Sequence, residues 1–423
     1  MIINDILQVI YAPKKAFKQI IDNPKYLGAF IVLIVFLGFQ VGYEYTQFSK
    51  TYAEETSLSH YTSFINATSG NWHGNSGVTL TNNDVNYFNY TVFTATQQGY
   101  MFVPNVFGNS SLQINGVNTS NVSVTFRDVF NVNCGQSGYQ NLSMVIKQVQ
   151  PQSAPQKVTL SLYSLNGTDF YQKDITGSLS STSAINQWNN LTIPLGTNAS
   201  GWTSNGAPTW SNVTSLKLDF IYPANSNVTV NVGALFFRGH YLSFTQYDST
   251  GVFLLLLQAF SLQFLLAWIL ITGLLYLMLK GLKSGVSWKP VFIAMGFALL
   301  VMVIRAIINL VATLALPAVY YPFDLSGGVG FTPYGTLAYP AQFIGISFAD
   351  TQVAFSNAEA LTATFRAINV GTLALGYVWL GALSAIILGT LKPEFSLIKR
   401  LALSAIALGI TIVVLIFLVV GIA

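Results

Sequence analysis

Side chains able to carry acid–base, nucleophilic or metal chemistry are few in this chain of 423 residues, and they are widely spaced. The histidines His60, His73 and His240 and the lone cysteine, Cys134, lack the spacing of a zinc site or a disulfide framework. The sequence contains no nucleophile-elbow, phosphate-loop or dinucleotide-binding motif. Pairs of carboxylates have the simpler interpretation of solvated surface groups. We therefore expect a protein that is not an enzyme and that uses no catalytic metal or cofactor.

Two arginines stand inside strongly apolar segments, where a charge is costly and therefore suggests a function. Arg305 begins the sequence RAIIN, which ends in Asn309, and Arg366 begins RAIN, which ends in Asn369. Helical rise places both arginines at a similar depth near one edge of a membrane. These four residues predict a polar cluster beneath an outer loop; two unrelated arginines that reach the interface are the alternative. Lipid phosphates or loop carboxylates would supply the negative charge, and the carboxylates available are Asp324, Asp350 and Glu359.

Aromatic side chains between residues 50 and 245 could stack on the apolar faces of sugars. The candidates are Tyr163, Tyr171, Trp202 and Trp210. Core packing is the alternative and is favoured for Trp210, whereas Trp202, between a glycine and a threonine, is the better candidate for an exposed ring. The same segment holds every N-x-[ST] sequon of the chain, which predicts N-glycosylation unless its Asn, Ser and Thr content alone produces the motif. The sequons are Asn66, Asn89, Asn109, Asn118, Asn121, Asn141, Asn166, Asn190, Asn198, Asn212 and Asn227.

The elements that hold these residues are of two kinds. Hydrophobic residues make up 52% of the chain and charged residues 8%, against about 25% charged residues in typical soluble proteins. This composition argues against a single soluble domain. Five apolar runs of roughly 18 residues or more predict a bundle of membrane helices. The runs are 26–43, 252–279, 291–316, 361–391 and 401–423.

Basic residues in the short connections set the expected orientation in the plasma membrane. Four precede the first span, three lie between the second and third, and three lie between the fourth and fifth, against three acidic residues on that side. The positive-inside rule therefore places residues 1–25 in the cytoplasm. Segment 44–250, the loop 317–360 and the C-terminus are then extracellular. Residues 1–25 predict short amphipathic helices broken at Ala12-Pro13, lying either on the membrane surface or against the bundle.

Segment 44–250 shows the period-two alternation of β-strands. Apolar and polar residues alternate over 122–126, 142–146, 158–162 and 216–222, and from Val228 through Ala234 to Phe236. One half-buried face per strand is typical of an antiparallel β-sandwich. We therefore expect an all-β, jelly-roll-like domain with its core at about 122–241, carried by the helical bundle.

Two resemblances accompany this prediction. The stretches FRDVFNVNC (126–134), QWNNLTIPLG (187–196), TWSNVTSLKLDFIY (209–222) and NVTVNVGALFFRGHY (227–241) resemble carbohydrate-binding-module or galactose-binding-like jelly rolls. The helical framework resembles the Yip (Ypt-interacting-protein-like) family of five-span membrane proteins, in APKKAFKQIIDNPKYLGAFIVLIV (12–35). It departs from that family by the large insertion after the first span. The family's trafficking role is not carried over, because the basic cytoplasmic segment here is short.

These features predict a non-enzymatic membrane protein that displays a glycosylated sandwich for binding glycans, envelope proteins or a partner protein, with membrane lipids around its helices. An accessory subunit of a larger membrane complex is the alternative. A transporter or channel is disfavoured, because the expected spans hold no acidic residue and no matched pair of broken helices. The net charge of +4 is too small and too scattered for binding nucleic acid. Low external charge and many sequons suit an archaeal cell surface.

Overall fold

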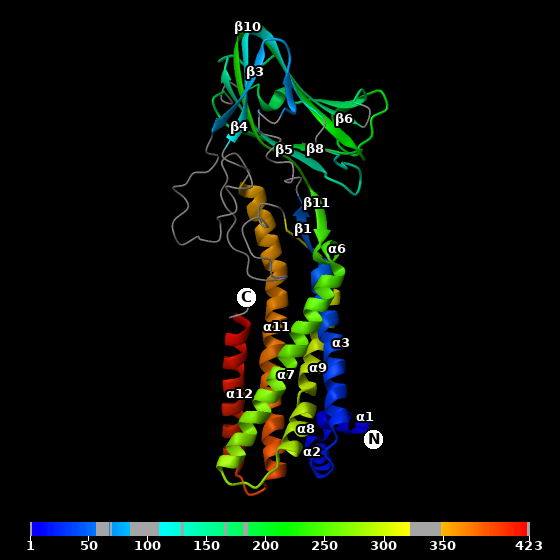
Figure 1. The fold of residues 1–423 in the computed structure, drawn as a ribbon, viewed down its shortest axis with the longest axis vertical. Helices are drawn as coiled ribbons and strands as arrows, with labels where there is room; N and C mark the ends of the chain where they lie inside the picture. Colours follow the sequence, from blue (N-terminus) through cyan, green and yellow to red (C-terminus); the bar gives the residue numbers. More distant parts are fainter. Residues whose placement is uncertain are drawn as a thin grey trace. The chain divides into compact units, whose positions relative to one another are not determined.

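The computed structural model divides the chain into two compact units (Figure 1). The helical unit comprises Met1–Thr51, Ser243–Val319 and Ala360–Ala423, and the β unit comprises Tyr52–Leu242 and Tyr320–Glu359. The residues that the structure describes are 2–55, 67, 70–84, 110–127, 131–164, 167–180, 185–321 and 348–420.

The helical unit confirms the five predicted apolar helices. Its elements are α1 (Ile2–Tyr11), α2 (Pro13–Asp22), α3 (Tyr26–Lys50), α6 (Phe244–Tyr247), α7 (Ser249–Gly281), α8 (Trp288–Ala298), α9 (Leu300–Ala315), α12 (Leu397–Val420) and the greater part of α11 (Phe348–Leu391). The stretches long and apolar enough to cross a membrane are Tyr26–Lys50, Ser249–Gly281, Trp288–Ala315, Thr362–Leu391 and Leu397–Phe417.

Capping contacts explain why several helices extend past the predicted apolar runs. Asp248 accepts a hydrogen bond from the backbone N–H of Gly251 at 2.7 Å, so α7 begins earlier than expected. Lys50 is the last residue of α3, and its Nζ donates to the carbonyl oxygens of Thr313, Leu314 and Leu316 at 2.9, 2.8 and 2.7 Å. These carbonyls lie at the C-terminal end of α9, where a cation is favourable. Helix α3 therefore continues past residue 43, where the predicted first span ends.

Close packing around Trp268 of α7 joins the helices. The indole stacks on Phe292 of α8, with ring centroids 4.4 Å apart, and donates to the Phe292 carbonyl oxygen at 2.7 Å. Gly296 permits this approach, because a Cβ there would lie 2.5 Å from an indole carbon. Phe17 and Ile20 of α2 are buried in the same core. Of the two arrangements expected for residues 1–25, α2 adopts the one packed against the bundle.

The outward faces of these helices are apolar. Each of the five long helices exposes large aliphatic or aromatic side chains on the side that does not face another helix. Examples are Leu27 and Ile34 of α3, Leu255 and Leu277 of α7, Val311 and Leu314 of α9, Leu375 and Val378 of α11, and Val413 and Phe417 of α12. Exposed apolar side chains in this number are typical of a surface that contacts lipid or another protein.

The β unit is an antiparallel assembly, as predicted. Its strands are β1 (Thr51–Glu55), β2 (Trp72–Gly74), β3 (Val78–Asp84), β4 (Ser110–Phe126), β5 (Asn141–Gln150), β6 (Lys157–Ser164), β7 (Phe170–Asp174), β8 (Asn189–Pro194), β9 (Trp202–Asn205), β10 (Val213–Arg238), β11 (His240–Ser243) and β12 (Val319–Tyr321). A short 3₁₀ helix, η5 (Thr176–Ser178), follows β7. A three-stranded sheet has the order β11-β1-β12, and the other strands form the main sheet.

Two long strands, β4 and β10, run through both halves of the main sheet. The first half of β10 pairs with β6 and with the end of β4, whereas its second half pairs with β5 and with the start of β4. Register irregularities between Ile221 and Val228 separate the two halves. The first half-sheet therefore contains β2, β4, β10, β6, β7 and β9, and the second contains β3, β4, β10, β5 and β8. The inward side chains of both form one apolar core.

The predicted alternation matches this core except near the end of β10. Val228, Val230 and Val232 point inward as expected. A register shift between Gly233 and Phe236 then moves the core positions to Leu235 and Phe237. The predicted alternation through Ala234 and Phe236 is therefore wrong, because one bulge reverses the facing of every residue after it.

Cys134 offers a built-in test of this core. Its side chain is fully buried, and burial raises the pKa of its thiol far above the ordinary value. Because the thiolate is the reactive form, we expect iodoacetamide at pH 8 to leave Cys134 unmodified in the folded protein and to modify it once a denaturant unfolds the β unit. Mass spectrometry measures the modification. Rapid alkylation without denaturant would contradict the described packing.

Candidate functional site

Polar side chains line the outer face of the first half-sheet. The antiparallel register places Lys217 of β10 opposite Ser161 of β6, and Ser161 opposite Gln172 of β7. Beside this row, Asp219 of β10 lies opposite Thr159 of β6. These positions alternate with core positions, so their side chains leave the sheet on the side away from the core. We call these five residues the polar strip.

Contacts within the polar strip hold its hydrogen-bonding groups in place. The Lys217 Nζ lies 2.8 Å from Asp219 Oδ1, and the Gln172 amide donates to Ser161 Oγ at 3.4 Å. Ser161 and Thr159 are 1% and 4% exposed, whereas the side chains of Lys217 and Asp219 retain 31% and 19% exposure. An ion pair this exposed adds little stability. A polar ligand that replaces the water around these atoms would therefore cost the fold little stability.

An aromatic pair continues the same face. Tyr163 of β6 lies opposite Phe170 of β7, and their ring centroids are 5.1 Å apart. Tyr163 is two residues from Ser161 on the same strand, so both leave the same side of the sheet. Both rings are half-buried. The outer face thus joins an apolar platform to a row of donors and acceptors, the combination by which proteins hold sugars.

The other three predicted stacking residues lie on the opposite side of the sheet. Tyr171 stacks on Trp210, with centroids 4.0 Å apart and ring planes 8° apart, and Trp202 meets Trp210 edge-on at 5.2 Å. Trp210 is only 5% exposed. This burial favours the alternative interpretation of Trp210 as a core residue. Tyr171 and Trp202 are half-buried and pack against the core.

Hydrogen bonds tie the two half-buried rings to the chain. The Tyr171 hydroxyl donates to the Pro208 carbonyl oxygen at 2.8 Å, and the Trp202 Nε1 donates to the Pro194 carbonyl oxygen at 2.9 Å. Burial raises the pKa of Tyr171, so its hydroxyl stays a donor. These bonds use the polar edge of each ring for structure. Tyr163 is thus better placed than Tyr171 or Trp202 to meet a ligand beside the polar strip.

The described sequons differ in exposure. The exposed asparagines are Asn118, Asn121, Asn198 and Asn227, and Asn141 and Asn212 are half-buried. Asn227 Oδ1 accepts the backbone N–H of Asn118 at 3.2 Å, so these two sequons lie side by side. Glycosylation at any of them stays a prediction. Asn66, Asn89, Asn109, Asn166 and the side chain of Asn190 lie outside the described residues.

In the helical unit, three of the four predicted members of the polar cluster are brought together. Arg305 Nη2 donates to Asn369 Oδ1 at 2.6 Å, and Asn309 Nδ2 donates to the same oxygen at 3.2 Å. Thr372 donates to Asn309 Oδ1 at 2.9 Å. Asn309 is fully buried. Helices α9 and α11 are therefore joined by a hydrogen-bonded network inside an otherwise apolar unit.

The acidic residue nearest in effect to Arg305 is one that the sequence analysis did not name. Glu44 of α3 interacts electrostatically with Arg305 and accepts a hydrogen bond from Gln40 at 3.3 Å. Glu44 lies one residue past the predicted first span, in the part of α3 that continues to Lys50. Arg366 makes no hydrogen bond or ion pair within the described part of the chain.

The sequence predicts three carboxylates as partners of the two arginines. Asp324 and the side chains of Asp350 and Glu359 lie outside the described residues. A cavity of about 70 Å³ adjoins Arg305 and Gln40, and both residues line it. The Arg305 Nε and the Gln40 Oε1 find no hydrogen-bond partner among the described residues. A polar cavity of this size suits about two water molecules.

Sequence reasoning missed two sets of residues for different reasons. Gln40 and Glu44 are four residues apart and share one face of α3. The predicted first run ends at residue 43, so it leaves Glu44 out. Ser161, Lys217 and Asp219 are the polar partners of the alternation that identified the strands. Their positions were predictable, but the pairing of β6 with β10 that places them side by side was not.

Replacing Asn369 tests the network of the helical unit. Asn369→Leu removes the acceptor shared by Arg305 and Asn309, and leaves a charged group buried without that partner. We expect a loss of about 2–3 kcal/mol of unfolding free energy, measured by thermal unfolding in detergent. Val370→Leu, at the exposed next position, is the control. Equal stability of the two variants would show that the network contributes nothing.

Comparison with known proteins identifies no family. No family model matches the chain, so the expected Yip membership gains no support, and no curated protein matches either. Among solved structures, the chain is similar to a family 11 carbohydrate-binding module from Clostridium thermocellum in complex with a β-1,3-1,4-mixed-linked tetrasaccharide, at 13% identity and a TM-score of 0.26, over 44% of this chain and 94% of that one. It is also similar to a CBM22-1 xylan-binding domain from Paenibacillus barcinonensis, at 14% identity and a TM-score of 0.20, over 41% and 88%. TM-scores this low carry no conclusion about function.

Proposed function

We propose that the chain is a membrane-anchored glycan-binding protein whose β unit holds a carbohydrate on the outer face of its first half-sheet. The observation that carries this proposal is the polar strip beside the Tyr163–Phe170 pair. The proposed function includes no chemical step. The β unit would bind and display, and the helical unit would anchor.

The chemistry of the face suits a sugar chain better than an apolar ligand. Lys217, Asp219 and Gln172 together supply donors and acceptors at fixed positions on adjacent strands, which match the hydroxyls of a sugar. Tyr163 and Phe170 supply apolar surface for a ring face. Because a sheet is extended, a ligand that follows it would meet both groups in succession.

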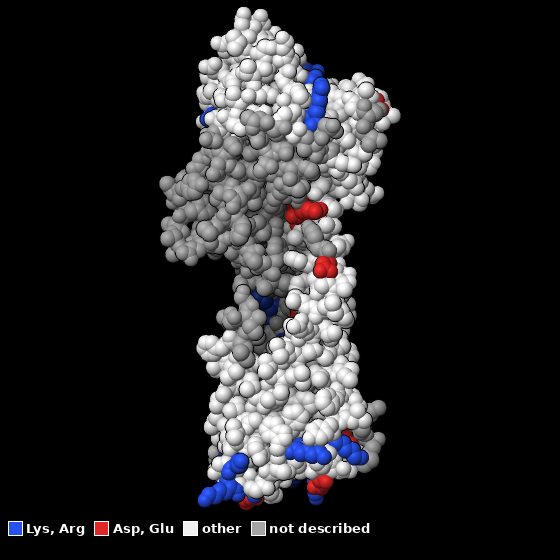
Figure 2. Space-filling view, in the orientation of Figure 1, with Lys and Arg blue, Asp and Glu red and all other residues white. Residues whose placement is uncertain are grey.

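The surface of the helical unit supports the proposed membrane anchorage. Figure 2 shows Lys and Arg gathered at the end where α2 lies, with an uncharged flank beside it. The basic residues at the helix ends there are Lys14, Lys15, Lys18, Lys25, Lys280, Lys283, Lys289, Lys392, Lys399 and Arg400. A basic end beside an apolar flank is the arrangement expected at a cytoplasmic membrane surface. The β unit, its sequons and the C-terminus would then be extracellular.

Paired variants test the proposed sugar site. Full-length protein in lipid nanodiscs is passed over immobilised β-glucan, xylan, mannan and galactan. We expect binding to at least one polysaccharide, weakened about tenfold or more by Tyr163→Ala, since aromatic contacts contribute about 1–2 kcal/mol. Lys217→Ala should weaken the same binding.

Trp202→Ala is the matched control, because Trp202 lies on the other side of the sheet. It should leave the affinity unchanged while protection of Cys134 from alkylation shows that each variant is folded. Equal weakening by Tyr163→Ala and Trp202→Ala, or no binding to any polysaccharide, would reject the assignment of this face.

A further inference from the structure

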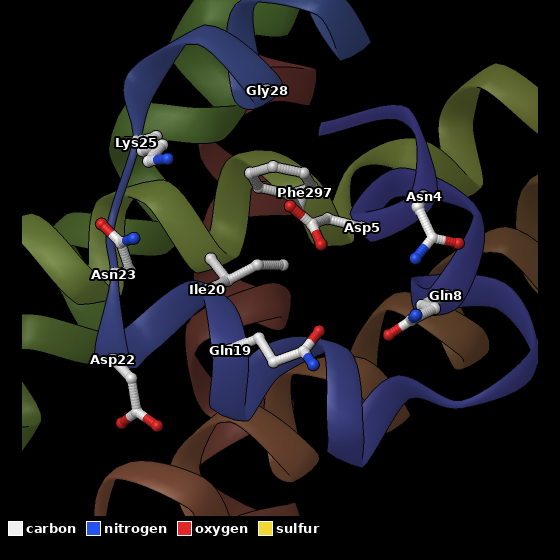
Figure 3. Close-up of a pocket in the computed structure, with 10 residues that line it drawn as sticks. All are labelled: Asn4, Asp5, Gln8, Gln19, Ile20, Asp22, Asn23, Lys25, Gly28 and Phe297. Atoms are coloured by element: carbon white, nitrogen blue, oxygen red, sulfur yellow. The ribbon is translucent and has the colours of Figure 1, made fainter. Parts of the chain in front are cut away.

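A second pocket, of about 380 Å³, lies in the helical unit where α1 and α2 fold against α3 and α8 (Figure 3). Its volume falls within the range of roughly 300–1,000 Å³ that is usual for small-molecule sites. Nothing in the proposed glycan binding uses this pocket. The helix bounds place it near the basic end of the unit.

Three polar side chains converge on the pocket. Figure 3 shows the carboxylate of Asp5 and the amides of Gln8 and Gln19 pointing into the same space, while Asp22 points away from it. Gln8 is only 8% exposed, and its Oε1 has no hydrogen-bond partner among the described residues. A buried acceptor without a donor is destabilising. The pocket, which Lys25 also lines, therefore presents the Asp5 carboxylate and one buried acceptor that a ligand with N–H donors would satisfy.

Two apolar side chains beside these polar groups are held in place by packing. Ile20 and Phe297 are both 4% exposed. A Cβ on Gly28 would lie 2.0 Å from Phe297 Cζ, so the ring rests directly on the backbone of α3. An aromatic ring beside a carboxylate attracts organic cations through both its π face and the neighbouring charge.

We propose that this pocket binds a small organic cation, an ammonium or guanidinium group attached to a short apolar portion. The cationic group pairs with Asp5 and donates to Gln8 Oε1, while the apolar portion contacts Ile20 and Phe297. A soluble amine and the headgroup of an ethanolamine phospholipid share this chemistry.

Two experimental arms separate these sources. In the first, agmatine and phenethylammonium are titrated calorimetrically into the full-length protein in nanodiscs made only of choline lipids, with 2-phenylethanol as the uncharged control. In the second, native mass spectrometry measures retention of ethanolamine lipid over choline and glycerol lipids. Both arms use the wild type, Asp5→Asn, Gln8→Leu and Asp22→Asn, and thermal unfolding verifies that each variant is folded.

We expect a cation in one arm to bind the wild type and to lose affinity about tenfold or more in Asp5→Asn and in Gln8→Leu, since a hydrogen bond to a charged group contributes about 1.5–3 kcal/mol. Asp22→Asn, the matched loss of a carboxylate that points away, should bind as the wild type does. The idea is overturned if no cation binds in either arm, if 2-phenylethanol binds as well as phenethylammonium, or if Asp22→Asn weakens binding as much as Asp5→Asn. If Asp5→Asn does not fold, unchanged binding by Gln8→Leu is by itself a rejection.

Discussion

Apolar side chains on the outward faces of five long helices are the constraint on which the rest of this chain depends. Val378 is 73% exposed and Ile34 67% exposed, and every one of these helices carries similar residues. Water does not stabilise such a surface, whereas hydrocarbon does. In the proposed lipid surrounding, the charges of the helical unit must either lie at the helix ends or find partners inside the bundle.

The interior of the helical unit shows how that requirement is met. Arg305 donates to Asn369 and lies within electrostatic range of Glu44, and Asn309 shares the same acceptor. Lys50 reaches the last carbonyls of α9, which would otherwise lack partners at a helix end. Polar contacts thus connect α3, α9 and α11 in addition to their apolar packing. Replacing one partner should cost more than its own hydrogen bond, because a buried charge stays behind.

In the β unit, strand pairing and register decide which side chains reach the core. Strands β4 and β10 run through both halves and bring them around one core. Alternation then leaves polar residues outside, and strand pairing sets Lys217 beside Ser161 and Gln172. The same alternation separates Tyr163 from Trp202. A binding face is therefore a direct consequence of register, and a shift by one residue would exchange it with the core.

Local periodicity explains how much of this could be predicted from the sequence. The apolar helices and the alternating strands each repeat a pattern within a few residues, so their existence and type were predictable. The bulge before Phe236 and the continuation of α3 through Glu44 depend on contacts with distant segments, and both were missed. The pocket at Asp5 and Gln8 was missed for the same reason, because it exists only once α1 and α2 fold back on α8.

The proposed orientation has the β unit outside the cell and the basic end of the helical unit in the cytoplasm. Its most direct test is labelling of single cysteines in a Cys134→Ala background with a membrane-impermeant maleimide. Ser204→Cys, at an exposed position of β9, should be labelled on intact cells. Lys14→Cys, at an exposed position of α2, should be labelled only after the membrane is opened. The reverse pattern would contradict the proposed orientation. Labelling of both positions on intact cells would contradict the proposal that a membrane separates them.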